Sequence, residues 1–313
     1  MVRSTNGKTA AKTQTDDRQQ LLAKLSDYDN EKYVKQGIEA NICQILNGMQ
    51  HPLPTGIFIK TPTLEAINWK GERNTYEHRF RGAKEDESGV LLSNCNLHVV
   101  SMSDLYIEEM YEEQGNKKTK LIGTYDTNTY PELKATKKEK IRVRRFFTII
   151  IVDDNKQPMH DGFLTISCHG LQSLGLASNI EQFLSELSNC FHAFRQDEKS
   201  YKMSYNFLAE HIFKAEFHSE LEGSEQQSWV AKIKDFVHPN SDGNNYPELR
   251  GNDKVIAFIR ENLDKDFAGS ISRVAAARHL MLANGQNSPA ALPPAPNVDY
   301  HYDAQFDIEE PPY

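Results

Sequence analysis

The run Ile141–Val152 (IRVRRFFTIIIV) most constrains the fold of this chain. It begins with alternating apolar and polar residues and becomes almost continuously apolar from Phe146 onward, interrupted only by Thr148. A run of this kind, rich in β-branched and aromatic residues and followed by turn residues, is typical of a strand buried on both faces. It is far shorter than the roughly 18 apolar residues that a membrane-spanning helix needs. We therefore expect a central β-strand here and no membrane span.

Further strands are expected on either side of this run. After it, DDNKQP (153–158) is rich in turn-forming residues, and GFLTISC (162–168) fits the return strand of a hairpin. Before it, four segments have the composition and length of strands: 56–59, 72–80, 89–100 and 120–125. Five or more antiparallel strands in a core of about residues 52–170 predict an α+β fold, with a mainly antiparallel barrel or sandwich of oligonucleotide-binding (OB) type.

Helices are expected to flank this core. Apolar residues recur at helical spacing over 29–48 and, more clearly, over 179–195, where Ser178 or Asn179 would cap the helix. A second hairpin is expected within 204–237, in which Tyr205–Leu221 pairs with Ser228–Val237. C-terminal helices are expected within 254–282, at Lys254–Asp264 and from Ser272 onward.

The two ends of the chain differ from the body in composition. Residues 1–28 are mildly basic and lack the apolar core of a signal peptide, whereas residues 283–298 have no charged side chain and are rich in Ala, Pro and Asn. We expect a flexible arm over 1–28, a globular body over 29–282, a disordered linker over 283–298 and an acidic tip over 299–313. Four cysteines in 313 residues are too few for a disulfide scaffold, so we expect a cytoplasmic protein.

The acidic tip is the most informative segment for function. Of the net charge of −8, five negative charges lie in residues 299–313, which leaves −3 for the rest of the chain. The last nine residues, QFDIEEPPY, resemble the tail of bacterial single-stranded-DNA-binding proteins, in which a disordered linker leads to acids and a Pro-Phe end. In this chain Tyr replaces the final Phe, and two prolines replace one. The resemblance implies docking on proteins of replication, recombination and repair through Phe306, Asp307, Ile308, Glu309, Glu310, Pro312 and Tyr313.

The physical chemistry of the tip is consistent with such docking. An apolar ring beside a carboxylate suits a pocket rimmed by Arg or Lys, and the acids speed the encounter with a basic surface. The same acids could occupy a basic groove of the protein itself. The alternative is an acidic tail that only increases solubility.

A basic stretch, 134–147 (KATKKEKIRVRRFF), is the candidate contact for nucleic acid. Positive side chains follow phosphates, and neighbouring aromatic rings give bases a surface on which to stack. The alternative is a solvated loop that leads into a strand, in which Arg142 and Arg144 share one face. The cationic candidates are Lys134, Lys137, Lys138, Lys140, Arg142, Arg144 and Arg145, with Arg79 and Arg81 nearby. The stacking candidates are Trp69, Tyr76, Phe80 and Phe146.

Two other groups of residues have ordinary structural explanations. Asp153 and Asp154, with His160, could hold a divalent cation as in a nuclease, but the same sequence suits a hairpin turn. Three cysteine–histidine pairs contain metal-ligand residue types without the paired spacing of a zinc site. These pairs are Cys95 with His98, Cys168 with His169, and Cys190 with His192.

The leading interpretation is a non-enzymatic protein that binds single-stranded DNA without sequence specificity. It would protect single strands and recruit replication and recombination proteins through its tip, as a divergent protein of a phage or mobile element. The alternatives are a metal-dependent nuclease that uses Asp153, Asp154 and His160, and a protein-interaction adaptor without nucleic-acid contact. No cofactor and no membrane partner are expected, and self-association is left open.

Overall fold

The computed structural model describes residues 41–47, 54–80, 85–113, 116–137, 140–223 and 227–264. The chain divides into two units, Met1–Glu39 and Ala40–Tyr313, and all of the described residues lie in the second. The expected arm, linker, tip and final helix lie outside the described residues. None of the described helices is long and apolar enough to cross a membrane.

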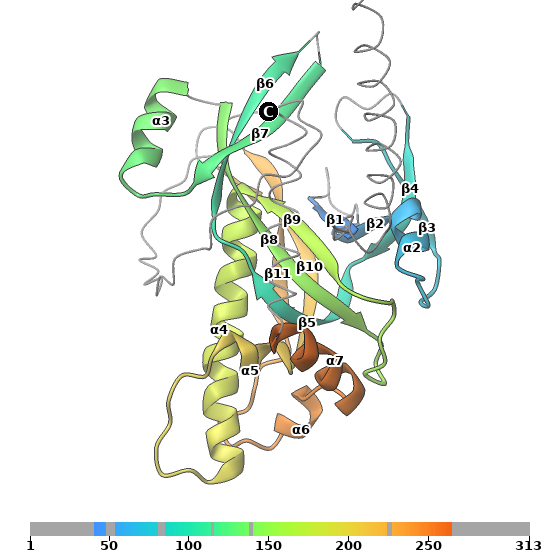
Figure 1. Ribbon diagram of the computed structural model, residues 1–313, viewed down its shortest axis with the longest axis vertical. Coiled ribbons are helices and arrows are strands. Elements are labelled where there is room, and N and C mark those ends of the chain that lie inside the picture. The colour runs from blue at the N-terminus through green and yellow to red at the C-terminus, as the bar shows by residue number, and fades with distance from the viewer. Residues whose placement is uncertain are drawn as a thin grey trace, which may run out of the picture. The chain divides into compact units, whose positions relative to one another are not determined.

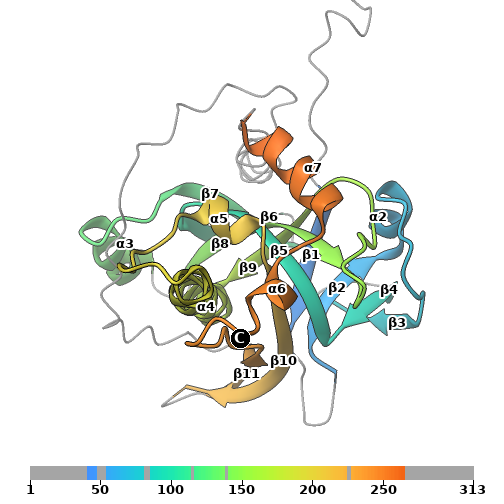
Figure 2. The same ribbon diagram turned by 90° about the horizontal axis from the view of Figure 1, so that it is seen from below.

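The described part of the chain has an α+β architecture in which a curled, mixed sheet of eleven strands forms a half-barrel (Figure 1). The strands are β1 (Asn41–Leu46), β2 (Gly56–Lys60), β3 (Thr75–His78), β4 (Glu87–Leu92), β5 (Asn94–Met102), β6 (Tyr106–Glu113), β7 (Asn116–Thr124), β8 (Ile141–Val152), β9 (Leu164–His169), β10 (Ile212–Glu222) and β11 (Ser228–Phe236). The helices are α2 (Thr61–Ala66), α3 (Thr129–Lys137), α4 (Gly170–Arg195), α5 (Tyr205–Ala209), α6 (Tyr246–Leu249) and α7 (Asp253–Asp264). The long helix α4 packs against β8, β9 and β11 (Figure 2).

Strand β8 occupies the centre of this sheet, as its sequence predicts. Every residue in it except Arg142 is buried. It pairs antiparallel with β5 and β6 along one edge and with β9 along the other. Phe147, Ile149 and Ile151 point into the main hydrophobic core, which also includes side chains from α4, β5 and β9. The continuous apolar run is therefore explained by burial on both faces.

The strands that pair around β8 form a closed path. β1 pairs with β2, β2 with β4, β5 with β8, β8 with β9, and β9 with β1, while only Ser93 separates β4 from β5. The backbone at the start of β2 lies very close to the backbone at the end of β4: a Cβ on Gly56 would lie 2.0 Å from the carbonyl oxygen of Leu92. The path has five segments: β1, β2, β4 continued by β5, β8 and β9. Each runs antiparallel to the one before it, so the first and the fifth run in the same direction. The β1–β9 pair is accordingly parallel, in a sheet that the sequence predicts to be mainly antiparallel.

The predicted helix over 29–48 is wrong where the structure describes that segment. Residues 41–46 form strand β1, which is hydrogen-bonded to β2 on one side and to β9 on the other. Cys43 and Ile45 belong to the main core. Helical spacing of a few apolar residues does not exclude a strand that is paired on both edges, since sheet pairing satisfies its backbone groups equally well.

Several other boundaries differ from the sequence-based expectation. Helix α4 begins at Gly170, where φ is +54°, so the expected caps Ser178 and Asn179 lie inside the helix. Residues 205–209 form helix α5, and the second hairpin begins only at β10. The segment 89–100 is divided at Ser93 between β4 and β5. Strand β6 and helix α3 were not expected from the sequence.

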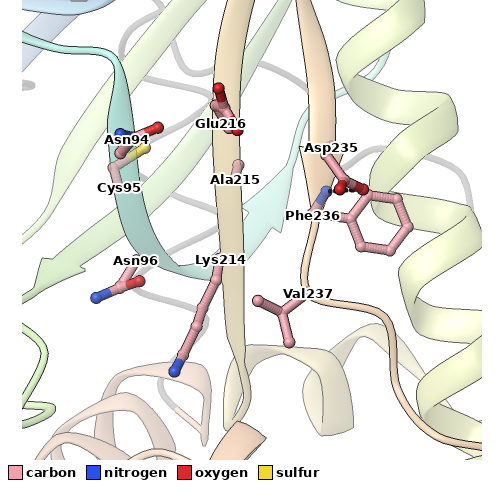
Figure 3. Close-up of a pocket in the computed structure, with 9 residues that line it drawn as sticks. All are labelled: Asn94, Cys95, Asn96, Lys214, Ala215, Glu216, Asp235, Phe236 and Val237. Carbon is pink, nitrogen blue, oxygen red and sulfur yellow. Dashed lines mark hydrogen bonds between the residues drawn. The ribbon is translucent and has the colours of Figure 1, made fainter.

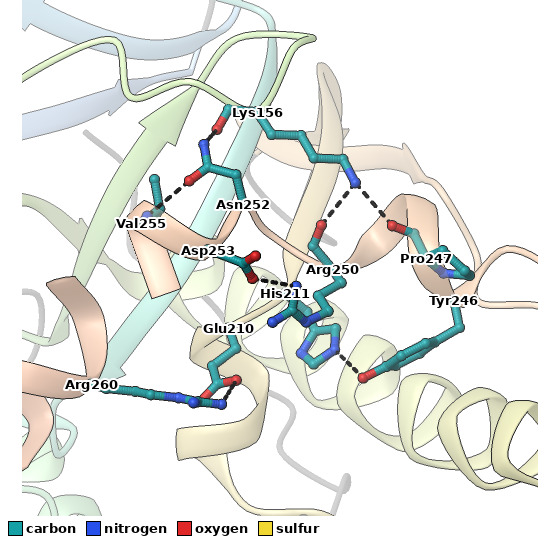
Figure 4. Close-up of polar contacts among 10 residues, drawn as sticks. All are labelled: Lys156, Glu210, His211, Tyr246, Pro247, Arg250, Asn252, Asp253, Val255 and Arg260. Carbon is teal, nitrogen blue, oxygen red and sulfur yellow. Dashed lines mark hydrogen bonds and ion pairs between the residues drawn. The ribbon is translucent and has the colours of Figure 1, made fainter. Parts of the chain in front are cut away.

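The predicted turn after β8 is confirmed, and hydrogen bonds join it to the chain around α6 and α7 (Figure 4). Lys156 has a left-handed backbone conformation, with φ of 60°. Its Nζ donates hydrogen bonds to the carbonyl oxygens of Pro247, at 2.9 Å, and Arg250, at 2.8 Å. The side chain of Asn252 donates in turn to the carbonyl oxygen of Lys156. One lysine therefore connects the hairpin with the C-terminal part of the described fold.

Three of the buried histidines, His98, His160 and His211, have strongly perturbed rings. Nε2 of His160 accepts a hydrogen bond of 2.9 Å from the backbone N–H of Ile151, which requires this nitrogen to be unprotonated. Burial lowers the pKa of each of the three rings from 6.5 to about 4. The folded protein therefore holds these histidines in the neutral form at neutral pH.

The free energy of unfolding should fall as the pH is lowered from about 6.5 to about 4. In this pH range the histidines become protonated in the unfolded chain but stay neutral in the folded protein. Each unit of difference in pKa corresponds to about 1.4 kcal/mol per histidine. Urea unfolding at a series of pH values measures the slope. His160→Gln should reduce this slope, because it removes one of the buried rings. An equal slope in wild type and His160→Gln would contradict the assignment.

Candidate nucleic-acid interface

The structure divides the predicted basic stretch between helix α3 and strand β8. Lys134 and Lys137 lie on α3, where Lys137 Nζ is 2.7 Å from a carboxylate oxygen of Glu109. Lys140 is exposed just before β8, and Lys138 lies outside the described residues. The described lysines are therefore surface residues, whereas the arginines that follow them enter the sheet.

The arginines on one face of β8 surround a buried carboxylate. Glu108 on β6 has no exposed surface. Nε and Nη2 of Arg144 lie 2.8 and 2.9 Å from its two oxygens, and Nε of Arg142 lies 2.6 Å away. Burial alone would raise the pKa of Glu108, but the charges and hydrogen bonds of Arg144 and Arg142 outweigh it and lower this pKa to about 2.

These contacts determine what Arg144 and Arg145 can do. The third guanidinium nitrogen of Arg144 donates to Ser167, so all three of its nitrogens are used inside the protein. Arg145 points to the opposite face of β8. It is 7% exposed, and one nitrogen contacts the sulfur of Met102 at 3.4 Å. In this conformation neither arginine is a surface cation, in contrast to the exposed stripe that the sequence suggested.

The predicted stacking residues fall into a buried pair and a surface pair. Trp69 is 4% exposed and stacks on the ring of His160, with centroids 6.2 Å apart. Phe146 is fully buried. Tyr76 and Phe80 are only half-buried. Trp69 and Phe146 thus serve the core here, while Tyr76 and Phe80 remain accessible.

Tyr76 and Phe80 belong to a cluster that we call the aromatic platform: the half-buried Lys60, Tyr76, His78 and Phe80, together with the buried ring of Phe58, which contacts the other rings. Residues 76 and 78 are two apart on strand β3 and therefore share a face, and Phe80 follows directly. Ring centroids are 6.2 Å apart for Phe58 and Tyr76 and 4.6 Å apart for His78 and Phe80. Nζ of Lys60 lies 4.7 Å from the centre of the Phe80 ring. β3 stands at the end of the strand order, so this platform lies at a sheet edge.

Sequence reasoning missed three members of the platform. Phe58 and His78 lie in short strands, and Lys60 ends one of them. The alternation of aromatic and polar residues in TYEHRF (75–80) is the signal that could have identified His78. Only the register of β2 with β4, and of β3 with β4, brings Phe58 and Lys60 to the same face.

Surface ion pairs border the platform. Lys60 pairs with Glu87 at 2.5 Å, and Arg79 pairs with Asp86 at 2.6 Å. All four side chains are at least one-third exposed. Burial lowers the pKa of His78, which favours its neutral form. Exposed ion pairs of this kind are worth at most about 1 kcal/mol, so a phosphate group can replace the carboxylate as the partner of either cation. Arg81 lies outside the described residues.

The residues of the nuclease alternative are engaged in the β8–β9 hairpin. Asp153 accepts a 2.7 Å hydrogen bond from the backbone of the turn, and Asp154 accepts one of 3.1 Å from Asn96. His160 uses its free lone pair on a backbone N–H, as described above. Among the residues that the structure describes, no group of three or more His, Cys, Asp or Glu side chains is suited to hold a metal ion. The geometry favours the turn interpretation.

The four cysteines have the character of core residues. Cys43, Cys95, Cys168 and Cys190 are buried free thiols. Burial raises the pKa of each of them. Because zinc binds the thiolate, these surroundings disfavour the form that a zinc site needs.

Arg144→Ala should destabilise the fold strongly, because it leaves Glu108 buried with a single cationic partner. Breaking a buried pair in this way typically costs about 3–5 kcal/mol, whereas removing both charges costs less. The double variant Glu108→Gln with Arg144→Met should therefore be more stable than Arg144→Ala alone. Chemical denaturation measures both. A loss below about 1 kcal/mol for Arg144→Ala would show that the pair is not a structural requirement.

Comparison with known proteins places the chain in a family. Residues 41–258 match the family described as Domain of unknown function (DUF5895), and this region is well over half of the chain. No curated protein and no solved structure gives a significant match. The matched region includes the aromatic platform and the Glu108 cluster. The chain therefore belongs to the DUF5895 family.

Proposed function

We propose that this protein binds single-stranded DNA without sequence specificity and without catalysing a reaction, and that the aromatic platform is its principal contact. The observation that carries the proposal is the row of half-buried rings on edge strand β3, with the ammonium group of Lys60 above one of them. Unpaired bases stack on such rings whatever their identity, while cations beside the rings attract the phosphates. Duplex DNA offers no comparable open base face, so the platform favours single strands.

The position of the platform suits an extended ligand. Among the described strands, none pairs with the outer side of β3, so a nucleic-acid backbone can pass along it. Lys60 and Arg79 can exchange their carboxylate partners for phosphates as the ligand binds. Such contacts release counterions and make binding weaker at higher salt concentration.

We also propose that the half-barrel acts in an OB-like manner, with its curved outer surface as the binding face. OB domains are five-stranded barrels with a Greek-key connection. In this chain the ring of strands follows the chain order instead. The proposed similarity therefore concerns the use of the sheet surface rather than the connectivity.

The proposal also includes a role for the acidic tip, and this part is argued from the amino-acid sequence of the tip. A ring and a terminal carboxylate beside acids suit a basic, apolar pocket on a partner of replication or recombination. The protein would thus protect single strands in the cytoplasm, as a divergent protein of a phage or mobile element, and recruit such partners through residues 306–313. Self-association stays open.

Replacing the rings tests the platform. Tyr76→Ala and Phe80→Ala should each weaken binding of a labelled mixed-sequence single strand by about 1–3 kcal/mol, because each removes a stacking surface. Fluorescence anisotropy measures the affinity, and Tyr201→Ala, which removes an exposed tyrosine elsewhere, is the matched control. Unchanged affinity in folded platform variants would refute the platform. A wild-type chain that binds no single strand at low salt would favour the adaptor function.

Removing the tip tests the second part. Deletion of residues 306–313 should tighten strand binding, most clearly at low salt, because the acids no longer compete for the cations. It should also abolish partner capture, since the terminal ring is the apolar anchor. Tyr313→Ala keeps all the acids and should weaken only partner capture. If the deletion changes neither property, the tip has no role in binding.

A further inference from the structure

A shallow pocket lies on the outer face of the sheet where β5, β10 and β11 run side by side (Figure 3). Its volume is about 310 Å³. Cys95, Ala215 and Phe236 form its floor and belong to the main core. Strand alternation therefore turns their neighbours outward. The outward side chains are Asn94, Asn96, Lys214, Glu216, Asp235 and Val237.

Strand register brings the polar groups of the pocket together. Lys214 lies opposite Asn96, Glu216 lies opposite Asn94, and Glu216 also lies opposite Asp235 on the other side. Two carboxylates thus stand on adjacent strands, and an ammonium group lies two residues away from one of them. Side chains directly opposite each other in an antiparallel pair are about 5 Å apart, so one small ligand can reach several of these groups.

The pocket and the aromatic platform lie on the same side of one continuous stretch of chain. Tyr76 of the platform pairs with Gly89 on β4, and β4 leads through Ser93 into β5. Both sites face away from the main core, to which Val90 and Leu97 belong. Five residues separate Gly89 from Asn94, which corresponds to about 17 Å of strand. A single strand of a few nucleotides can therefore extend from one site to the other.

The pocket groups that are not engaged within the protein determine which chemical groups a ligand must offer. Glu216 pairs with Lys234 at 2.6 Å, and one oxygen of Asp235 accepts a 2.9 Å bond from the backbone N–H of Phe236, so each keeps a further oxygen for a ligand. Among the described residues Lys214 has no carboxylate within ion-pair distance. An ionised carboxylate only accepts hydrogen bonds, whereas the ammonium group only donates them. The ligand must therefore offer N–H donors next to an anionic group.

We propose that this pocket binds an unpaired nucleotide whose base carries an exocyclic amino group, as cytosine, adenine and guanine do. Carboxylates accept hydrogen bonds from the amino group of cytosine, and unpaired bases expose these edges to proteins. Thymine has no amino group, and its single N3–H donor lies between two carbonyl oxygens that would face the carboxylates unfavourably. Lys214 contacts the phosphate. The inference rests on the proposed function and gives it a base preference that stacking on the platform does not supply.

Two homopolymers of equal length test this preference. The full chain should bind oligo(dC) about fivefold more tightly than oligo(dT) in an anisotropy titration, which is the lower end expected for one hydrogen-bonded base contact. The double variant Glu216→Ala with Asp235→Ala removes both acceptors and should bind both oligomers equally. Glu220→Ala is the matched control, because Glu220 is a lysine-paired carboxylate on the same strand outside the pocket, and it should keep the preference.

A modified ligand repeats the test without altering the protein. An oligo(dC) with N4,N4-dimethylcytosine has no amino donor and should bind to wild type no better than oligo(dT). Equal binding of oligo(dC) and oligo(dT) by wild type would overturn the inference and leave the proposed function intact. A dC preference that survives in the double variant would remove the pocket as its source. A chain that binds neither oligomer would overturn the proposed function and this inference together.

Discussion

The pairing of β8 with three neighbouring strands is the constraint on which the rest of the described structure depends. β5, β6 and β9 each form hydrogen bonds with it, and through β5 and β9 it closes the path that leads around β1, β2 and β4. Because β8 is buried over nearly its whole length, the three arginines near its start need partners inside the protein. Glu108 on the paired strand β6 meets the charge of Arg144, and the same pairing that builds the sheet places it there.

The aromatic platform is a consequence of this closed path. β2 carries Phe58 and Lys60 to the outer face, and β4 holds β3 beside them. Gly89 lies under this cluster, and a Cβ there would be 2.3 Å from the carbonyl oxygen of Ile59 and 2.8 Å from the ring of Phe58. The absence of a side chain at this position thus lets the Phe58 ring lie against the sheet. A rigid backbone with rings fixed at its edge limits the entropy that stacking a base would cost.

Much of the strand pattern could be predicted from the sequence, because it rests on local signals. The apolar run of β8 matches its observed bounds, and the turn that follows it is where its residues place it. Helix α7 also begins and ends close to the expected residues. Strand β1 was missed because its partners, β2 and β9, are known only from the fold. Its few apolar residues fit the spacing of a helix as well as that of a strand.

The candidate site was harder to predict for the same reason. A run of lysines and arginines indicates charge, yet only the register of β6 with β8 reveals that Arg142 and Arg144 face a glutamate. Aromatic residue type likewise does not distinguish Trp69, which packs in the core, from Tyr76, which stays accessible. The proposed contact with DNA is therefore assigned to edge strand β3 rather than to the basic stretch.

Photo-crosslinking can identify the side chains on which a bound single strand stacks. Single-stranded DNA that carries 5-iododeoxyuridine links to aromatic side chains on which its bases stack, and peptide mapping of the adduct identifies them. We expect crosslinks to Tyr76 or Phe80, within the peptide that contains β3, and their loss when unlabelled single strands compete. Crosslinks confined to other parts of the chain, or their absence under conditions in which the strand is bound, would contradict it.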